Sequence, residues 1–196
     1  MGSTNVQPLP FRSAGLAAGQ TDEATIRAAA RLVASAVSVI SVGAGETLAG
    51  LTALSVSLMS IDPPTLVLCV HRAARGYAAL ARSSRFAVNV LGGDQREIAE
   101  HFAGRADEAG GSPFDGRWQP FADGLSRLAE CAAALECERE DIIERRADAI
   151  VIGRVRRAVV GSGSGALVRW RGVYDQLGWS QHEIMRAVGL QPGGEA

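Results

Sequence analysis

The sequence predicts a mostly β protein in which antiparallel strands form a closed or partly closed barrel, with small helices at the periphery. About six or seven strand-like runs are spread over 196 residues, a length that suffices for one domain with a substantial core. Links of hairpin length join most of these runs, and the spacing of βαβ units is absent. Together these observations favour an antiparallel barrel over a doubly wound parallel sheet.

The first half of the chain alternates strands with short helices. Residues 1–20 are rich in Gly, Ser and Pro and have no periodicity, so we expect a flexible segment before a domain that spans residues 21–180. Thr21-Asp22 offers a helix N-cap and Glu23 an acidic first turn, which predicts a helix over 22–34. The remaining patterns predict strands at 37–42, 47–57, 65–71 and 85–91 and helices at 73–82 and 94–102.

The second half reads as a loop followed by three long β runs. Residues 104–124 are rich in Gly and Asp, which is typical of a loop. The β runs cover 128–144, 149–160 and 166–177, and the flexible turn Gly161-Ser162-Gly163-Ser164-Gly165 joins the last two. A short helix is expected at 181–188, within a C-terminal tail over 181–196.

Composition excludes several function classes. The formal net charge is −1, so there is no electrostatic case for binding nucleic acid or an anionic membrane. All 20 basic residues are Arg, which excludes a Schiff-base lysine and a P-loop lysine. Anion recognition must therefore use Arg, backbone N–H groups or hydroxyls. With no signal-peptide pattern and no run of about 18 apolar residues, we expect a cytoplasmic protein.

Familiar metal and catalytic patterns are also missing. The three cysteines have no metal-ligand spacing, and their apolar neighbours indicate buried small side chains. The three histidines are far apart in sequence, and no G-x-S-x-G motif is present. We therefore expect no metal site and no catalytic triad.

The most informative stretch is GLTALSVSLMSIDPPTLVLCV, Gly50 to Val70, where a strand of small and hydroxyl residues precedes a rigid Asp-Pro-Pro. Small residues at a strand edge let a flat ligand approach the backbone closely. The hydroxyls of Thr52, Ser55 and Ser57 could then bond to ring carbonyls, a polyol chain or phosphate. The alternative is a strand that simply turns small polar residues to solvent.

The chain resembles the flavin reductase family over about residues 24–178. The resemblance rests on the order and spacing of short motifs, none decisive alone: Arg27-Ala28-Ala29, Val37-Ser38-Val39-Ile40-Ser41, Gly50-Leu51-Thr52-Ala53-Leu54-Ser55, Asp62-Pro63-Pro64, Leu66–Val70, Arg85–Leu91, His101–Arg105, Leu135-Glu136-Cys137, Ile152-Gly153 and Arg171–Tyr174. It implies a split β-barrel that forms a homodimer and binds FMN or FAD at the barrel edge near the dimer interface. It also implies reduction of that flavin by NADH or NADPH, which supplies reduced flavin to a monooxygenase partner.

The resemblance also assigns positions to the flavin. Thr52, Ala53, Leu54 and Ser55 would lie along the isoalloxazine ring, with Ser57 further along the same run. Cys69, Val70 and His71 would end the next strand beneath the flavin. The loop Arg72–Tyr77, with Arg72, Arg75, Gly76 and Tyr77, would hold the phosphate tail, and Phe102-Ala103-Gly104 would close the other side.

Three departures from the family pattern leave alternatives open. Leu54 replaces the usual Asn, and two arginines replace hydroxyls in the phosphate loop. Asp148 stands near the nicotinamide, where many members have His, and would repel an anionic reduced flavin. The alternatives are a flavin-binding protein that does not reduce free flavin and a split-barrel oxidase with another substrate. The arginines of Arg154–Arg157 form an exposed strand face or meet an adenosine diphosphate tail.

An obligate homodimer is expected from apolar residues beyond the flavin strand. Leu58, Met59 and Ile61 continue the run after Ser57, while Trp170 and Tyr174 add large amphipathic surfaces to the last β run. The alternative is that these residues fill the barrel interior.

Overall fold

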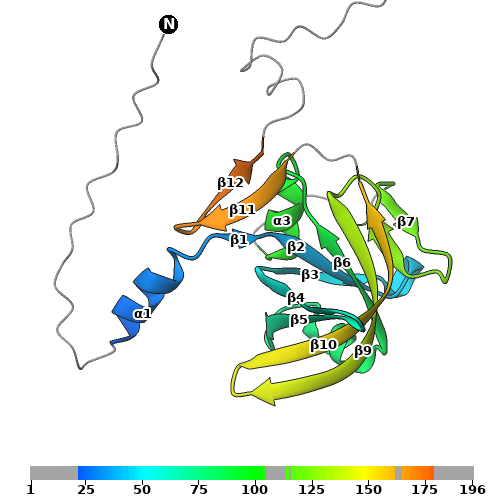
Figure 1. Ribbon diagram of the computed structural model, residues 1–196, viewed down its shortest axis with the longest axis horizontal. Coiled ribbons are helices and arrows are strands. Elements are labelled where there is room, and N and C mark those ends of the chain that lie inside the picture. Colours follow the sequence, from blue (N-terminus) through cyan, green and yellow to red (C-terminus); the bar gives the residue numbers. More distant parts are fainter. Residues whose placement is uncertain (1–21, 105–113, 115, 162–164, 179–196) are drawn as a thin grey trace, which may run out of the picture.

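The structure, a computed structural model, describes residues 22–104, 114, 116–161 and 165–178 (Figure 1). The expected segment 1–20, the centre of the Gly-Ser turn, and the expected helix 181–188 with its tail lie outside these residues. The described helices are α1 (Glu23–Ala30), α2 (Tyr77–Arg82) and α3 (Arg96–Phe102), with a 3₁₀ turn η1 (Gly45–Thr47). The described strands are β1 (Ser35–Ala36), β2 (Ser38–Val42), β3 (Ala49–Ala53), β4 (Ser55–Ile61), β5 (Pro64–His71), β6 (Arg85–Val90), β7 (Trp118–Pro120), β8 (Ser126–Leu128), β9 (Ala133–Arg145), β10 (Asp148–Val160), β11 (Ala166–Trp170) and β12 (Val173–Leu177).

The main sheet has seven antiparallel strands in the order β3-β2-β6-β9-β10-β5-β4. It curls into a barrel, as Figure 1 shows, and the predicted mostly β, split-barrel class is confirmed. Two smaller sheets flank it, β1-β11-β12 and the hairpin β7-β8. None of the described helices is long and apolar enough to cross a membrane.

The prediction of a single strand over 47–57 is wrong. These residues belong to two strands, and the break between them determines how the barrel is arranged. Residues 49–53 form β3 at one edge of the main sheet, whereas 55–61 form β4 at the other edge. Leu54 alone connects them. A hairpin needs a turn of about two residues, so β4 does not fold back on β3 but crosses to the opposite edge. The barrel is therefore split at Leu54.

Alternation along β2 explains why every one of its residues is buried. Ile40 and Val42 point into the barrel core with Leu66, Leu68 and Phe86. Val37, just before the strand, and Val39 point the other way, into a second core beneath α3, the β7-β8 hairpin and β11. A strand covered on both faces buries all its side chains, including Ser38 and Ser41, which are 2% and 0% exposed.

The other boundaries differ from expectation in local ways. The run 166–177 is two strands, because Arg171-Gly172 makes a hairpin turn with φ of 52° and 85°. The loop 104–124 contains the short strand β7. Helix α1 ends at Ala30, has no buried residue and stands apart from the barrel in Figure 1.

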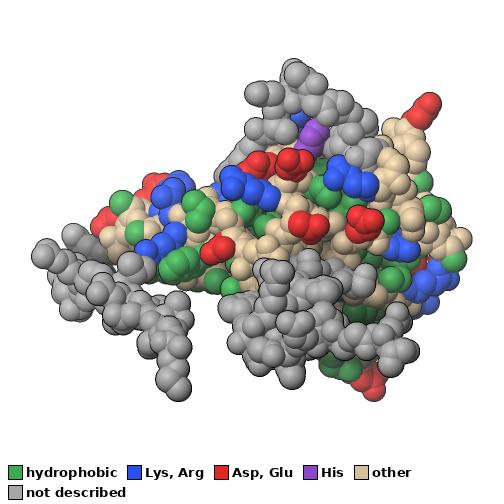
Figure 2. All heavy atoms as spheres, turned by 90° about the horizontal axis from the view of Figure 1, so that it is seen from above, with side chains coloured by type: hydrophobic (Ala, Val, Ile, Leu, Met, Phe, Trp, Pro, Cys, Tyr) green, Lys and Arg blue, Asp and Glu red, His purple; other side chains and the backbone are tan. Residues whose placement is uncertain are grey.

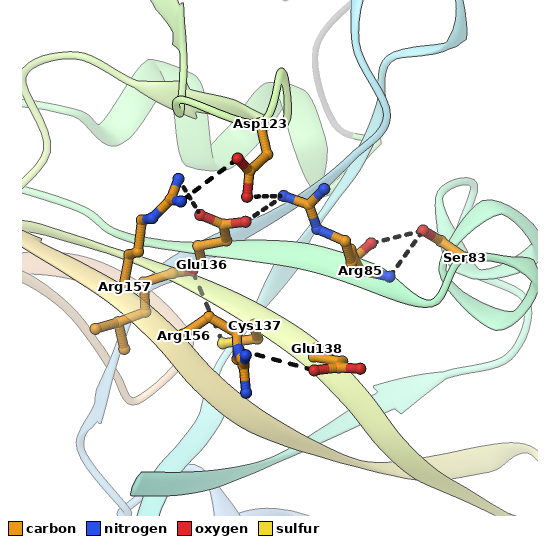
Figure 3. Close-up of polar contacts among 9 residues, drawn as sticks. Ser83, Arg85, Asp123, Glu136, Cys137, Glu138, Arg156 and Arg157 are labelled. Carbon is orange, nitrogen blue, oxygen red and sulfur yellow. Dashed lines mark hydrogen bonds and ion pairs between the residues drawn. The ribbon is translucent and has the colours of Figure 1, made fainter.

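A ring of four charged side chains fixes the β7-β8 hairpin to the barrel (Figure 3). Glu136 on β9 is 2% exposed and pairs with Arg85 of β6, while its second oxygen makes no hydrogen bond and lies 3.5 Å from Nη1 of Arg157 on β10. Asp123, between β7 and β8, lies 3.3 Å from Arg85 and 3.4 Å from Arg157. A buried carboxylate needs such partners, so this ring holds the hairpin close to three strands.

The cysteine interpretation is confirmed at two positions and wrong at one. Cys131 and Cys137 are buried, and loss of solvation, with a smaller contribution from Glu136, raises the pKa of Cys137 to about 12. Cys69 is exposed, because alternate residues of β5 face outward.

We predict that one thiol per chain reacts with an aromatic disulfide reagent at pH 8 in the native state. A thiolate is the reactive species, and burial suppresses it at Cys131 and Cys137. Denaturant should release the other two thiols, and Cys69→Ser should abolish the native reaction. Native labelling that persists in that variant would contradict the burial of the other two.

Candidate functional site

A cleft opens along β3 at the split in the barrel. Its volume is about 360 Å³, within the range of about 300–1,000 Å³ typical of ligand sites. We call it the β3 cleft. It is lined by Leu51, Thr52, Leu54, Ala73, Ala74, Arg75, Phe102, Ala103, Gly104 and Arg169. Four segments far apart in sequence thus meet there: the end of β3, the loop between β5 and α2, the end of α3, and β11.

A second hollow of about 260 Å³ continues the cleft toward the start of β3. It shares Arg75 and Phe102 with the β3 cleft and adds Ala49, Gly50, Gly76, His101 and Phe114. The ring of Phe102 meets those of Phe114 and Trp118 edge to face, at centroid distances of 5.1 and 5.6 Å. These aromatic contacts hold Phe102 between the two hollows.

The floor of the cleft is backbone. In the main sheet β3 pairs with β2 alone, so its other edge carries peptide groups that no strand satisfies. Glycine lets the chain approach this edge: a Cβ on Gly76 would lie 2.5 Å from the carbonyl oxygen of Gly50. A Cβ on Gly50 would in turn lie 2.7 Å from the Phe102 ring. The edge of β3 thus offers peptide groups at the cleft, and their contact with a flat ligand stays a prediction.

Thr52 has a partner already. Its hydroxyl donates a hydrogen bond of 2.7 Å to the backbone oxygen of Ala99 in α3. The side chain therefore ties α3 to β3, and toward a ligand its oxygen can accept but not donate.

The structure brings together six of the predicted site residues in the β3 cleft and a seventh, Gly76, in the adjoining hollow. The six are Thr52, Leu54, Arg75, Phe102, Ala103 and Gly104. Three others are buried in the barrel core instead: Ala53, Val70 and Tyr77. Arg72 pairs with Glu144 at 2.9 Å, which leaves it less available to a phosphate.

Tyr77 shares that carboxylate. Its hydroxyl donates to Glu144 at 2.5 Å, and burial, reinforced by Glu144, raises its pKa. This arrangement anchors the first turn of α2 to the end of β9, so the loop before it holds its place over β3.

The remaining predicted residues lie elsewhere, with exposed side chains on β4, β5 and β10. They are Ser55, Ser57, Cys69, His71 and Asp148, and none of them lines the cavities described here. Ser55 stands opposite Cys69, and His71 opposite Asp148. Their proposed contacts with a cofactor remain predictions.

Sequence reasoning missed Arg169, which reaches the cleft from β11, and the contribution of Ala49, Gly50, His101 and Phe114 to the second hollow. No local motif marks Arg169, because its place depends on β11 pairing with β1 rather than with the barrel. Within the described ranges, no three His, Cys, Asp or Glu side chains gather in a way that could hold a metal ion.

The chain belongs to the family described as flavin reductase like domain, whose model matches residues 30–178. A probable flavin reductase from Rhizobium meliloti (strain 1021) is 38% identical over 125 residues, which are 64% of this chain and 39% of that protein. The FMN reductase (NADH) RutF of Methylorubrum populi is 35% identical over 131 residues, 64% of this chain and 60% of that protein.

The matched region thus covers less than two thirds of the length of these curated relatives. Among solved structures, BorF, the flavin reductase component of a bacterial two-component tryptophan halogenase, superposes with a TM-score of 0.72 at 28% identity. That match covers 80% of this chain and 99% of BorF. The split-barrel fold is therefore shared with a flavin reductase component.

We predict that Gly76→Ala destabilises the fold by about 1–3 kcal/mol and weakens flavin binding, because the new methyl group meets backbone that cannot move aside. Denaturant unfolding and flavin titration measure the two effects. Gly116→Ala is the matched control, since a Cβ there meets no atom within 4 Å. Equal behaviour of the two variants would contradict the close approach of the loop to β3.

Proposed function

We propose that this protein is an NAD(P)H:flavin oxidoreductase that reduces FMN with NADH in the cytoplasm. The observation that carries the proposal is the cleft of backbone, small side chains and one aromatic ring along the open edge of β3. Membership of the flavin reductase family and similarity to an FMN reductase (NADH) support it. All three cysteines are free, in keeping with a reducing compartment.

The residues present fit a flavin. Gly50 and Gly76 let Phe102 and the loop before α2 pack closely on β3, so the cleft has narrow walls that suit a flat ring. Leu51, Leu54 and Phe102 would hold the ring, while the guanidinium of Arg75 would hold the phosphate. FAD remains the alternative flavin, and NADPH the alternative reductant. A bound flavin supplies the capacity to accept a hydride.

The chain's own contribution is orientation and the exclusion of water. Leu54 and Phe102 present apolar surface to the cleft, and the Thr52–Ala99 hydrogen bond fixes the separation of its two walls. Placing two reactants in contact can lower a barrier substantially without any acid or base. The proposed reaction needs none, in keeping with the absence of a catalytic triad pattern in the sequence.

The alternative is a protein that binds flavin without reducing it. Two departures from the family pattern, Leu54 and Asp148, suggest this alternative. Leu54 lines the cleft and offers no amide to the ring. Asp148 is exposed at the start of β10 and does not line the cleft, so its charge would be screened by solvent rather than set directly against a ligand there.

The test is anaerobic addition of NADH to the purified chain with excess FMN. We expect the visible flavin band to bleach over many turnovers, with NADPH, FAD and riboflavin as comparison substrates. Tight FMN binding without bleaching by either nicotinamide would favour the binding protein. Neither binding nor turnover of any flavin would exclude both functions.

A partner oxygenase follows from the same proposal. BorF is a component of a two-component halogenase, and the present chain shares its fold over almost the whole of BorF. We propose that reduced flavin leaves this chain for a flavin-dependent monooxygenase. Transfer by diffusion needs no permanent contact between the two proteins.

We also propose a homodimer. Leu58, Met59 and Ile61 on β4 are 53%, 60% and 76% exposed, so they do not fill the barrel interior. They lie on the outer edge strand, and Ile150 of β10 is exposed as well. An apolar strand edge of this kind is unstable alone in water, and a second copy of the chain would cover it. Trp170 and Tyr174 are half-buried in the flanking sheet.

We predict that the chain sediments at low micromolar concentration with twice its monomer mass of 20.5 kDa. Met59→Glu should shift it to monomer, because the dimer would bury an unpaired charge. Val160→Glu is the control, since Val160 is 85% exposed at the far end of β10. A wild-type monomer that binds flavin stoichiometrically would overturn the dimer.

A further inference from the structure

Three arginines surround a hollow that the proposed flavin site does not use. Arg31 follows α1, Arg169 lies on β11, and Arg171 is in the β11-β12 turn. The hollow has a volume of about 620 Å³ and its remaining walls are small or apolar. We call it the arginine pocket. It shares Leu54 and Arg169 with the β3 cleft, so the two cavities adjoin.

Hydrogen bonds and aromatic rings hold this arrangement together. The backbone N–H of Arg171 donates to the backbone oxygen of Arg31 at 2.7 Å, and the Trp170 indole donates to Leu32 at 3.2 Å. The guanidinium of Arg171 lies over Trp170 at 4.5 Å, and that of Arg169 over Tyr174 at 5.4 Å. These contacts hold the end of α1 against the β11-β12 hairpin, although the helix itself is exposed.

The described residues do not neutralise the charge of the arginine pocket. No carboxylate among the described residues pairs with Arg31, Arg169 or Arg171. By contrast, Arg154 lies 2.7 Å from Glu140, Arg156 3.8 Å from Glu138, and Arg157 reaches both Asp123 and Glu136. On the face shown in Figure 2, acidic and basic side chains likewise lie interspersed. The arrangement at the pocket therefore suits an anion supplied from outside.

Arg171 also occupies a position that disfavours it. Its φ of 52°, followed by 85° at Gly172, corresponds to a type I′ turn, in which Asn-Gly is the favoured pair. A side chain retained at a cost in backbone strain is a signal of function when it faces a cavity, as this one does.

We infer that Arg31, Arg169 and Arg171 bind the phosphate groups of the nicotinamide dinucleotide. The inference rests on the proposed function, because it needs a nicotinamide that reaches the flavin past Leu54. Ribose and phosphate follow the nicotinamide in that molecule, and the arginine pocket is the cationic cavity that adjoins Leu54. The flavin phosphate is assigned to the opposite wall, at Ala73–Arg75. The adenylate half of FAD is the competing source of phosphate.

The test uses two variants of the full chain, each with a matched control. Arg31→Gln is compared with Arg27→Gln, which removes the same charge from α1 at a residue that pairs with Glu23. Arg171→Asn is compared with Arg146→Asn, since Arg146 has the same backbone conformation, φ 51°, in the β9-β10 turn and does not line the pocket. Asn suits both turns, so neither Asn variant should lower the melting temperature.

Calorimetry with ADP-ribose and 2′-phospho-ADP-ribose measures the pocket without any redox step. We expect each pocket variant to raise the dissociation constant about tenfold, as the loss of one charged hydrogen bond predicts, and the controls to change it less than twofold. The KM for NADH and NADPH should rise in parallel, with the KM for FMN unchanged. A 2′-phosphate contact would appear as tighter binding of 2′-phospho-ADP-ribose that the variants abolish.

Several results would overturn the inference. The first is that the pocket variants bind ADP-ribose as tightly as the wild type does. The second is that the control variants lose as much affinity for ADP-ribose as the pocket variants. The third is that the pocket variants lose affinity only for FAD or FMN. Failure of the proposed function looks different: ADP-ribose binding that depends on Arg31 and Arg171, in a chain that does not reduce any flavin, would leave a phosphate site without a reductase.

Discussion

The single residue between β3 and β4 is the constraint on which the structure depends. One residue cannot make a hairpin, so the two strands go to opposite edges of the seven-stranded sheet and the barrel stays open between them. An open edge is normally a liability that proteins cover. Here Gly76 brings one loop against β3, and the hydrogen bond from Thr52 to Ala99 brings α3 against it. The cleft is the space that these two covers leave.

The position of the cleft on a strand edge explains why few of its side chains could act as acids, bases or nucleophiles. A cleft on a strand edge offers peptide groups first, and larger or charged residues on β3 would block them. In the proposed function, small residues along β3 would let a flat ligand approach this edge. The larger and the charged side chains of the cleft come from other parts of the chain. They are Phe102, Arg75, and Arg169 on a separate small sheet. Binding and orientation are then the protein's contribution, and the redox chemistry belongs to the cofactor.

Much of the fold could be predicted, because each strand carries its own apolar pattern. The run at 37–42 indicated a strand, and the structure adds that a core lies on each side of β2. The break at Leu54 could not be seen, since no Gly, Pro or Asn interrupts the run from 51 to 61. The Arg171-Gly172 turn was readable in principle, because a residue followed by Gly between two apolar runs is a hairpin signal.

The sequence could indicate only those residues of the cleft that belong to short local motifs. Thr52, Leu54, residues 75–76 and residues 102–104 come together because each belongs to the end of β3 or covers it. The family resemblance assigned Ser55, Ser57, Cys69 and His71 to the flavin as well, and these contacts stay predictions. In the structure the four residues follow the split and face outward from β4 and β5. Arg169 was missed because its position depends on a long-range pairing with β1. Alternation within a strand can be read from sequence, but the edge to which a strand goes cannot.

The most direct test of this account is a crystal structure of the chain with FMN bound. The account predicts the ring against Leu51–Leu54 and Phe102, within hydrogen-bonding distance of the β3 backbone, and the phosphate at Ala73–Arg75. A flavin seated on the outer face of β4 and β5, against Ser55, Ser57 and Cys69 of the same chain, would contradict it. In that case the open edge of β3 would not be the site.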